Sequence, residues 1–330
     1  MPASFDLRRL RYFVKVAELG SVTRAAEVLH VAQPALSQHM RALESELGVQ
    51  VLARGSRGVA LTEAGERLYA EARELLGGIK SMVERVKDDA RDPEGEVVIG
   101  VGQTIGSILM VPLLQMAAER LPRVRIQIRE VLSGLIPDLV RTGAVDFALS
   151  YNMASGHGIE AVTALSESMC LVGQRALVER HLGRRRAGSG DVRFAELSQV
   201  PLYLSRRTHI LREMIEKVAR RKGVALRLLG EVDSLYIMKE LALGGTGCTV
   251  LSHANFRREL DHEDLFVGRI TAPLIRRDIC FVRRHGQALP RAARETAGLA
   301  AEALARMVEE GVWRASLAAR PEELRRAFQA

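Results

Sequence analysis

The segment Leu19–Gly65 reads LGSVTRAAEVLHVAQPALSQHMRALESELGVQVLARGSRGVALTEAG, and its spacing of apolar, polar and turn residues predicts two short helices. They cover Thr23–Leu29 and Gln33–Leu47, with Pro34 in the first turn of the second helix and Gly48 at its end. Only three residues separate them. This is helix-turn-helix geometry, in which the second helix enters the major groove of DNA by its N-terminal end.

A further helix is expected before these two. Asp6 is its candidate N-cap, apolar residues recur after Asp6 at helical spacing, and Gly20 ends the helix. Ser21 or Thr23 can cap the helix that follows.

The exposed side of the predicted Gln33–Leu47 helix carries Gln33, Ser37, Gln38 and Arg41. Glutamine can make paired bonds to adenine, arginine suits guanine or phosphate, and serine bonds bases or phosphate. Such residues are equally typical of a helix face that simply contacts water. Taken alone, they leave both interpretations open.

Residues 49–61, VQVLARGSRGVAL, favour the DNA interpretation. Two short apolar runs flank an Arg-Gly-Ser-Arg-Gly turn, which predicts a wing hairpin with Arg54 and Arg57 near the phosphate backbone or the minor groove. Thr62 is the predicted cap of a long helix after the hairpin, with acidic residues in its first turn.

Together these motifs resemble the LysR-type transcriptional regulators. The matching segments are AQPALSQHMRALE at residues 32–44, LGV at 47–49, RGSRG at 54–58 and LTEAG at 61–65. The first 65 or so residues most resemble the nitrogen assimilation control branch, with one departure at Leu52, where many members carry Phe. The resemblance implies a winged helix-turn-helix over residues 1–65 that contacts double-stranded DNA through Thr23, Gln33, Pro34, Ser37, Gln38, Arg41, Arg54 and Arg57.

The next segment, residues 66–92, is predicted to be a linker helix that pairs with a second copy of the chain. Its apolar positions alternate in steps of four and three, the pattern of a coiled-coil seam. A helix packed on its own domain is the alternative. Paired helices would let two copies of the winged helix-turn-helix domain, called the head from here on, read inverted half-sites. The seam consists of Leu68, Ala72, Leu75, Ile79, Met82 and Val86.

Residues 93–310 alternate between strand-like and helical patterns, which indicates parallel sheets covered by helices. The family resemblance implies two α/β lobes of periplasmic-binding-protein type: lobe I at about 93–165 and 270–310, and lobe II at about 166–269. The fold class expected is therefore α+β and multidomain. The predicted strands are 96–101, 124–130, 145–151, 170–173, 202–204, 226–232, 248–251 and 278–283, and the helices are 108–120, 136–142, 210–222, 234–243 and one from about 290.

Small and polar residues follow several of these strands, where ligands bind in such sheets and where helix N-termini favour anions. They predict a cleft for a small anionic effector, although Ser and Thr at helix starts are more often plain caps. The resemblance leaves a second reading open, because members of the nitrogen-control branch are described as acting without any effector. The predicted effector residues are Gly102, Gln103, Thr104, Ser133, Ser205, Thr208 and Thr246.

Composition narrows the function further. The net charge of +8 favours an anionic partner, yet residues 1–91 hold 14 Lys and Arg against 12 Asp and Glu, so the DNA prediction depends on geometry. Three scattered cysteines suit buried thiols in a reducing cytoplasm and exclude a disulfide framework or zinc site. No enzyme motif, signal peptide or membrane span is recognisable. We expect no cofactor and no metal.

The resemblance also implies higher assembly. It predicts homodimers that join into homotetramers through the regulatory domains, with RNA polymerase as a further candidate partner. The extension 311–330 exceeds the usual length of the family. It is expected to form a short helix that packs on a neighbouring subunit or lies in solvent.

Overall fold

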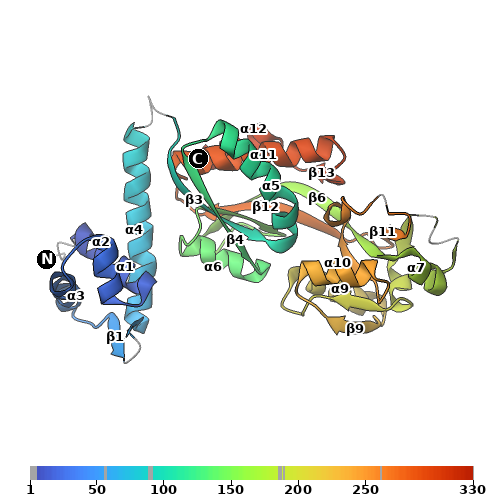
Figure 1. Ribbon diagram of the computed structural model, residues 1–330, viewed down its shortest axis with the longest axis horizontal. Coiled ribbons are helices and arrows are strands. Elements are labelled where there is room, and N and C mark those ends of the chain that lie inside the picture. Colours follow the sequence, from blue (N-terminus) through green and yellow to red (C-terminus); the bar gives the residue numbers. More distant parts are fainter. Residues whose placement is uncertain are drawn as a thin grey trace. The chain divides into compact units, whose positions relative to one another are not determined.

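The computed structural model describes residues 6–55, 58–87, 92–184, 188, 190–260 and 262–329 (Figure 1). The chain divides into two compact units, Met1–Ala90 and Arg91–Ala330. Helices, one hairpin and a long helix make up the first unit, and the sheets of the second unit are covered by helices. The expected α+β, multidomain fold class is confirmed.

The head begins with three helices packed around a small apolar core. Phe13 and Ala25 are fully buried in that core. Asp6 caps the first helix and Ser21 caps the second, each by accepting a hydrogen bond from a backbone N–H in the first turn. Thr23, the other candidate cap, lies inside the second helix. The helices are α1 (Leu7–Leu19), α2 (Val22–Leu29) and α3 (Gln33–Leu47).

A hairpin of β1 (Leu52–Gly55) and β2 (Gly58–Leu61) follows, then the long helix α4 (Glu63–Lys87). The Thr62 hydroxyl accepts a hydrogen bond from the N–H of Gly65 at 3.0 Å and caps α4 as predicted. A Cβ at residue 65 would lie 2.0 Å from the Val51 carbonyl oxygen, so only glycine fits in the LTEAG motif. At about 1.5 Å per residue, α4 is roughly 37 Å long.

The first lobe of the second unit is a sheet with helices on both faces. Strand β3 runs parallel to β4 and β5, and β12 runs antiparallel to β5. Alternate residues of β3 face α5 and α11 on one side and α6 on the other. The elements are β3 (Gly95–Gly102), α5 (Gln103–Arg120), β4 (Val124–Val131), α6 (Ile136–Arg141), β5 (Phe147–Tyr151), β12 (Arg276–Arg284) and α11 (Arg291–Glu309).

The second lobe has its own apolar core. Strand β8 pairs with β9 in parallel, and β11 pairs with β7 in parallel. The predicted helix 210–222 is observed at those residues, and strand 202–204 likewise. The elements are α7 (Arg175–Leu182), β7 (Asp191–Arg193), β8 (Leu202–Leu204), α9 (Ile210–Lys222), β9 (Leu228–Glu231), α10 (Leu235–Leu243), β10 (Thr249–Ser252) and β11 (Leu265–Thr271).

One long strand, β6 (Ile159–Gln174), belongs to both lobes. It pairs with β12 in its first part and with β10 and β11 in its last part. The prediction of a strand limited to residues 170–173 was wrong, and β7 and β11 were missed. Polar residues such as Ser166, Glu167 and Ser168 interrupt the apolar pattern of β6, so the sequence there does not resemble a buried strand.

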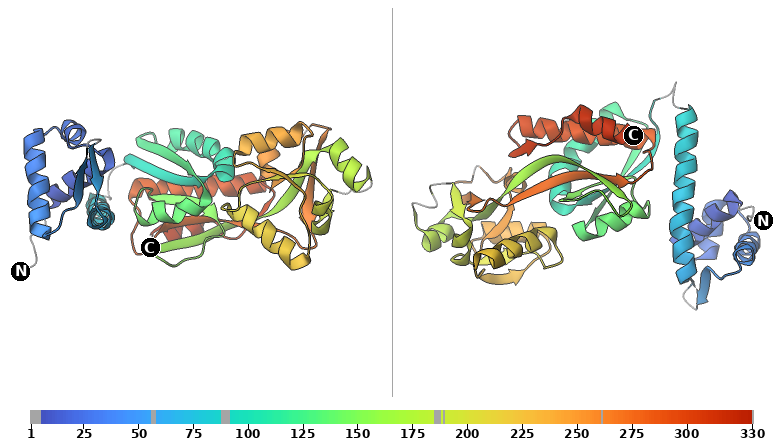
Figure 2. Two further views of the ribbon diagram at one scale, coloured as in Figure 1. Left: turned by 90° about the horizontal axis from the view of Figure 1, so that it is seen from below. Right: turned by 180° about the vertical axis from the view of Figure 1, so that it is seen from behind.

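The C-terminal extension packs on the first lobe of its own chain. Strand β13 (Ala315–Leu317) pairs with β6, and α12 (Pro321–Gln329) lies against α11; both helices are red in Figure 2. Trp313, Leu324 and Phe328 are at most 2% exposed and belong to the core of that lobe. The extension is therefore an integral part of the lobe, rather than a segment lying in solvent. No described helix is both long and apolar enough to cross a membrane.

Candidate functional site

The start of helix α3 presents a polar face to solvent. Gln33, Pro34, Gln38 and Arg41 are all exposed, and Thr23 is exposed in the first turn of α2. These are the side chains that a helix entering the major groove would bring to base edges and phosphates.

Ser37 is the exception, because it is only 7% exposed. The expectation that it lies on the outer face was wrong. Both α1 and α2 pack against α3, which widens the buried arc of that helix to include Ser37. The amide of Gln33 lies 3.5 Å from the Ser37 hydroxyl and can donate to it, so Ser37 is placed to orient Gln33.

Hydrogen bonds connect the wing, the β1–β2 hairpin, to the helices at two places. The carboxylate of Glu44, in α3, accepts hydrogen bonds from the N–H groups of Val51 and Leu52 at 3.0 and 3.1 Å. The carbonyl of Gly20 accepts from the N–H of Val59 at 2.9 Å. The hairpin therefore has a fixed position relative to α3.

Of the two predicted wing residues, Arg54 lies in β1, where its backbone is paired with Val59. Arg57 lies outside the described residues.

The predicted seam of α4 divides into two parts. Ala72 is 3% exposed, and Leu68 packs with it against the head core. These two residues therefore contact their own chain and are not exposed for a dimer contact. Leu75 and Met82 are 47% and 51% exposed. They lie seven residues apart on one stripe of the helix, with Ile79, which is partly exposed, between them. Val86 lies in α4 as well.

The lobes of the second unit enclose a small cavity of about 20 Å³. Gln103 and Thr104, at the start of α5, line it from the first lobe, and Ser205, just after β8, lines it from the second. These three residues were predicted to meet because each follows the end of a strand, and the structure brings them together. The structure adds His209 and Arg277, which sequence reasoning missed.

Arg277 is the buried cation of this cavity, with 1% of its surface exposed. Its Nε donates to the carboxylate of Glu167 at 2.9 Å, and its guanidinium lies 3.8 Å from the centre of the Tyr151 ring. Its Nη1 has no hydrogen-bond partner among the described residues. Nδ1 of His209 is likewise buried without a partner there, and burial together with the charge of Arg277 lowers the pKa of His209.

Glu167 is held by more than Arg277. Its carboxylate also accepts hydrogen bonds from Nε1 of Trp313 at 2.7 Å and from the hydroxyl of Ser252. The strands β6 and β12, the extension and the second lobe therefore meet at one buried carboxylate.

The remaining predicted effector residues do not line the cavity. Gly102 is the last residue of β3 and directly precedes Gln103, which lines the cavity. Ser133 is buried, and its hydroxyl has no hydrogen-bond partner among the described residues. Thr208 is exposed, and its carbonyl faces the turn beside Ser133. Thr246 bonds the carbonyl of Leu241 at the end of α10 and precedes β10, at the opposite end of that strand from the cavity.

Both regions match known family profiles. Residues 7–66 match the profile described as bacterial regulatory helix-turn-helix protein, lysR family, and residues 90–305 match the LysR substrate binding domain. The second match alone covers more than half of the chain. The chain belongs to the LysR family of regulators.

Relatives within the family are transcriptional regulators. The chain is 32% identical over 269 residues to the nitrogen assimilation regulatory protein Nac of Klebsiella aerogenes, covering 81% of this chain and 85% of that protein. It is 30% identical over 301 residues to a probable hydrogen peroxide-inducible genes activator of Streptomyces viridosporus, covering 91% and 94%. The resemblance to the nitrogen assimilation branch is confirmed, and the LysR-type chain is not an enzyme.

Solved LysR-family structures share the fold. A full-length OxyR variant from Pseudomonas aeruginosa has a TM-score of 0.76 and 22% identity, covering 96% of this chain and 99% of that one. Full-length CbnR in complex with its target DNA has a TM-score of 0.60 and 23% identity, covering 92% and 99%.

The cysteines of this LysR-family chain are buried and unpaired, as predicted. Burial raises the pKa of both Cys170 and Cys248 to about 12, and also raises that of Cys280. A buried thiol in this state reacts slowly, since the thiolate is the nucleophile.

Proposed function

We propose that this LysR-type regulator reads inverted half-sites in double-stranded DNA as a dimer. The observation that carries the proposal is the exposed row Gln33, Gln38 and Arg41 on a helix whose distance from the wing is fixed through Glu44. With a nearly neutral head, base contacts from a few side chains and the pairing of two heads must supply affinity.

The dimer contact that we propose uses the exposed part of the α4 stripe, namely Leu75, Ile79 and Met82. Leaving large apolar side chains in water is unfavourable by about 25 cal/mol per Å², and a second copy of the stripe would remove them from it. Tetramers would need further contact surfaces on the second unit, Arg91–Ala330, which is called the regulatory unit from here on. Exposed apolar residues there, such as Val111 on α5 and Tyr236 on α10, support that assembly.

We further propose that a small anionic effector binds between the lobes. Within the described residues, one N–H of the buried Arg277 guanidinium and Nδ1 of His209 have no hydrogen-bond partner, and a carboxylate or similar anion would supply one. The cavity of about 20 Å³ holds at most one water, so the lobes must separate to admit an effector.

Thermal unfolding of the full chain tests this proposal in the presence of carboxylates, amino acids or inorganic anions. A specific effector must raise the melting temperature by mass action. For a ligand that binds in this cavity, Ser205→Val replaces the hydroxyl with bulkier methyl groups and should abolish the shift, while Thr246→Val, outside the cavity, should retain it. A shift that persists equally in both variants would place the ligand elsewhere.

A constitutive regulator without effector is the second candidate. Two observations favour it: the cavity is small, and Glu167 already neutralises Arg277. Full DNA binding together with no thermal shift for any compound would support this alternative.

A further inference from the structure

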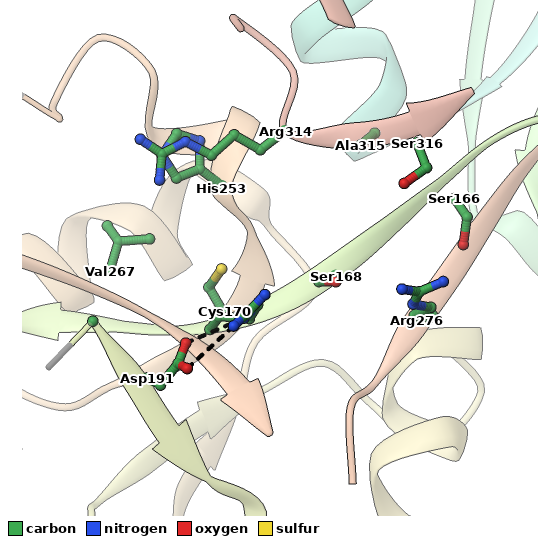
Figure 3. Close-up of a pocket in the computed structure, with 12 residues that line it drawn as sticks. Ser166, Ser168, Cys170, Asp191, His253, Val267, Arg276, Arg314, Ala315 and Ser316 are labelled. Atoms are coloured by element: carbon green, nitrogen blue, oxygen red, sulfur yellow. Dashed lines mark hydrogen bonds and ion pairs between the residues drawn. The ribbon is translucent and has the colours of Figure 1, made fainter. Parts of the chain in front are cut away.

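A second, larger pocket of about 490 Å³ lies on the regulatory unit (Figure 3). Residues from β6, β7, β11, β12 and β13 line it, together with His253 after β10. Arg314, Ala315 and Ser316 contribute one wall, and these residues lie beyond residue 305, where the family match ends.

Strand geometry separates this pocket from the cavity between the lobes. In β12, Arg276 lines the pocket while its neighbour Arg277 lines the cavity. In β6, Ser166 and Ser168 line the pocket while Glu167 between them bonds Arg277. Successive side chains of a strand point to opposite faces, so one pair of strands separates two polar sites.

The extension follows the same alternation. Trp313 points to the Glu167 side, where it donates to that carboxylate, and Arg314 points into the pocket. Ser316 pairs with Ser166 across β13 and β6 and lies on the pocket side with it. A ligand in the pocket would therefore contact the extension as well as β6 and β12.

The pocket carries excess positive charge. Arg269 is paired with Asp191 through two contacts of 3.1 Å. Arg276 and Arg314 make no ion pair in the part of the chain that the structure describes. Among the described lining residues, three guanidinium groups and one carboxylate leave a net charge of +2.

His253 adds a buried polar group to this wall. It is 6% exposed, its Nδ1 has no hydrogen-bond partner within the described ranges, and Figure 3 shows the guanidinium of Arg314 beside its ring. Burial and the charge of Arg314 lower the pKa of His253 to about 4, so the ring is neutral at pH 7. A neutral imidazole tolerates the nearby arginines and can bond a ligand oxygen.

We propose that this pocket binds a small molecule with a double negative charge, carried by carboxylate or phosphate groups. Arg276 binds the anionic groups from β12 and Arg314 from the segment just before β13, and the serine hydroxyls and His253 bond the remaining oxygens. Arginine forks suit both carboxylate and phosphate, which is why the two chemical sources share one site. The bound ligand holds β13 against β6, the strand that belongs to both lobes.

Calorimetric titration of the full chain at constant ionic strength tests the proposal, with succinate as the carboxylate probe and inorganic phosphate as the phosphate probe. At least one probe should bind with a stoichiometry of one per chain. Arg276→Gln with Arg314→Gln should weaken that binding by at least about tenfold, because two charge-assisted contacts are lost. The probe that binds more tightly identifies the chemical source.

The matched control is Arg320→Gln with Arg326→Gln, which removes two exposed arginines of the extension that lie outside the pocket. This control should bind as the parent chain does. The proposal would be overturned if both double variants bound equally weakly or if the pocket variant bound as the parent chain does. It would also be overturned if neither probe bound at millimolar concentration. Ser205→Val should leave the binding intact, which distinguishes this site from the cavity between the lobes.

Discussion

The two units of the chain use polar residues in opposite ways. The head exposes Gln33, Gln38 and Arg41 on the outside of a small apolar core. The regulatory unit buries Arg277 and Glu167 to 1% exposure between its lobes. The head therefore presents polar side chains to a partner, whereas the stability of the regulatory unit depends on buried charges that must stay paired.

The largest expected effect concerns the buried pair. Glu167→Ala leaves Arg277 uncompensated and removes the acceptor of Trp313, so the free energy of unfolding of the regulatory unit should fall by about 3–5 kcal/mol. Urea unfolding followed by the fluorescence of Trp313, the only tryptophan of the chain, measures it.

The matched control is Asp191→Ala, which breaks the exposed pair with Arg269 and should cost less than about 1 kcal/mol. Equal losses in both variants would contradict the contrast between buried and exposed charges.

The next effect concerns the exposed stripe of the head unit. Leu75→Glu should weaken dimerisation by about 1.5–3 kcal/mol, because an apolar contact is replaced by two like charges at the symmetric interface. Sedimentation equilibrium measures the change. Leu274→Glu, at another exposed apolar position, should leave the dimer intact; if it dissociates the dimer as strongly, α4 is not the interface.

A smaller effect concerns base recognition. Gln33→Ala should reduce discrimination between the preferred operator and single-base variants by about 1–3 kcal/mol, while affinity for unrelated DNA stays nearly constant. Fluorescence anisotropy on both kinds of DNA measures this. Ser45→Ala, exposed near the other end of α3, serves as control. Unchanged discrimination in Gln33→Ala would remove this residue from the recognition surface.

The last effect concerns His253 and emerges only as the pH falls. The unfolded chain takes up a proton on this residue near its usual pKa of about 6.5, whereas the folded chain resists until about pH 4. Its contribution to stability is therefore complete above pH 6.5 and declines as the pH falls towards 4, by less than about 1.4 kcal/mol per pH unit. His253→Gln should flatten this part of the stability curve, measured by urea unfolding at several pH values; identical curves would contradict it.

The head could be predicted from sequence because its determinants are local. The caps Asp6 and Ser21, the turn at Gly20 and the hairpin all lie within one short stretch, and the structure confirms those elements. Ser37 was misplaced because the buried arc of α3 depends on two neighbouring helices. Leu68 and Ala72 were assigned to the dimer seam although the fold places them against the head core.

The regulatory sites depend on long-range contacts and were harder to predict. Gln103, Thr104 and Ser205 were chosen correctly as residues that meet, since strand order brings them to one edge. Arg277 was missed because its partner Glu167 is 110 positions away. Thr246 was included although it precedes β10, and the cavity lies at the carboxyl end of that strand, where Val250 and Leu251 line it.

Selection of DNA from a random pool by the full chain asks directly whether two exposed heads read DNA together. Paired heads should enrich inverted repeats whose half-site centres lie about 10 base pairs, or a multiple of that, apart. Enrichment of single half-sites, or of no common sequence, would contradict this prediction.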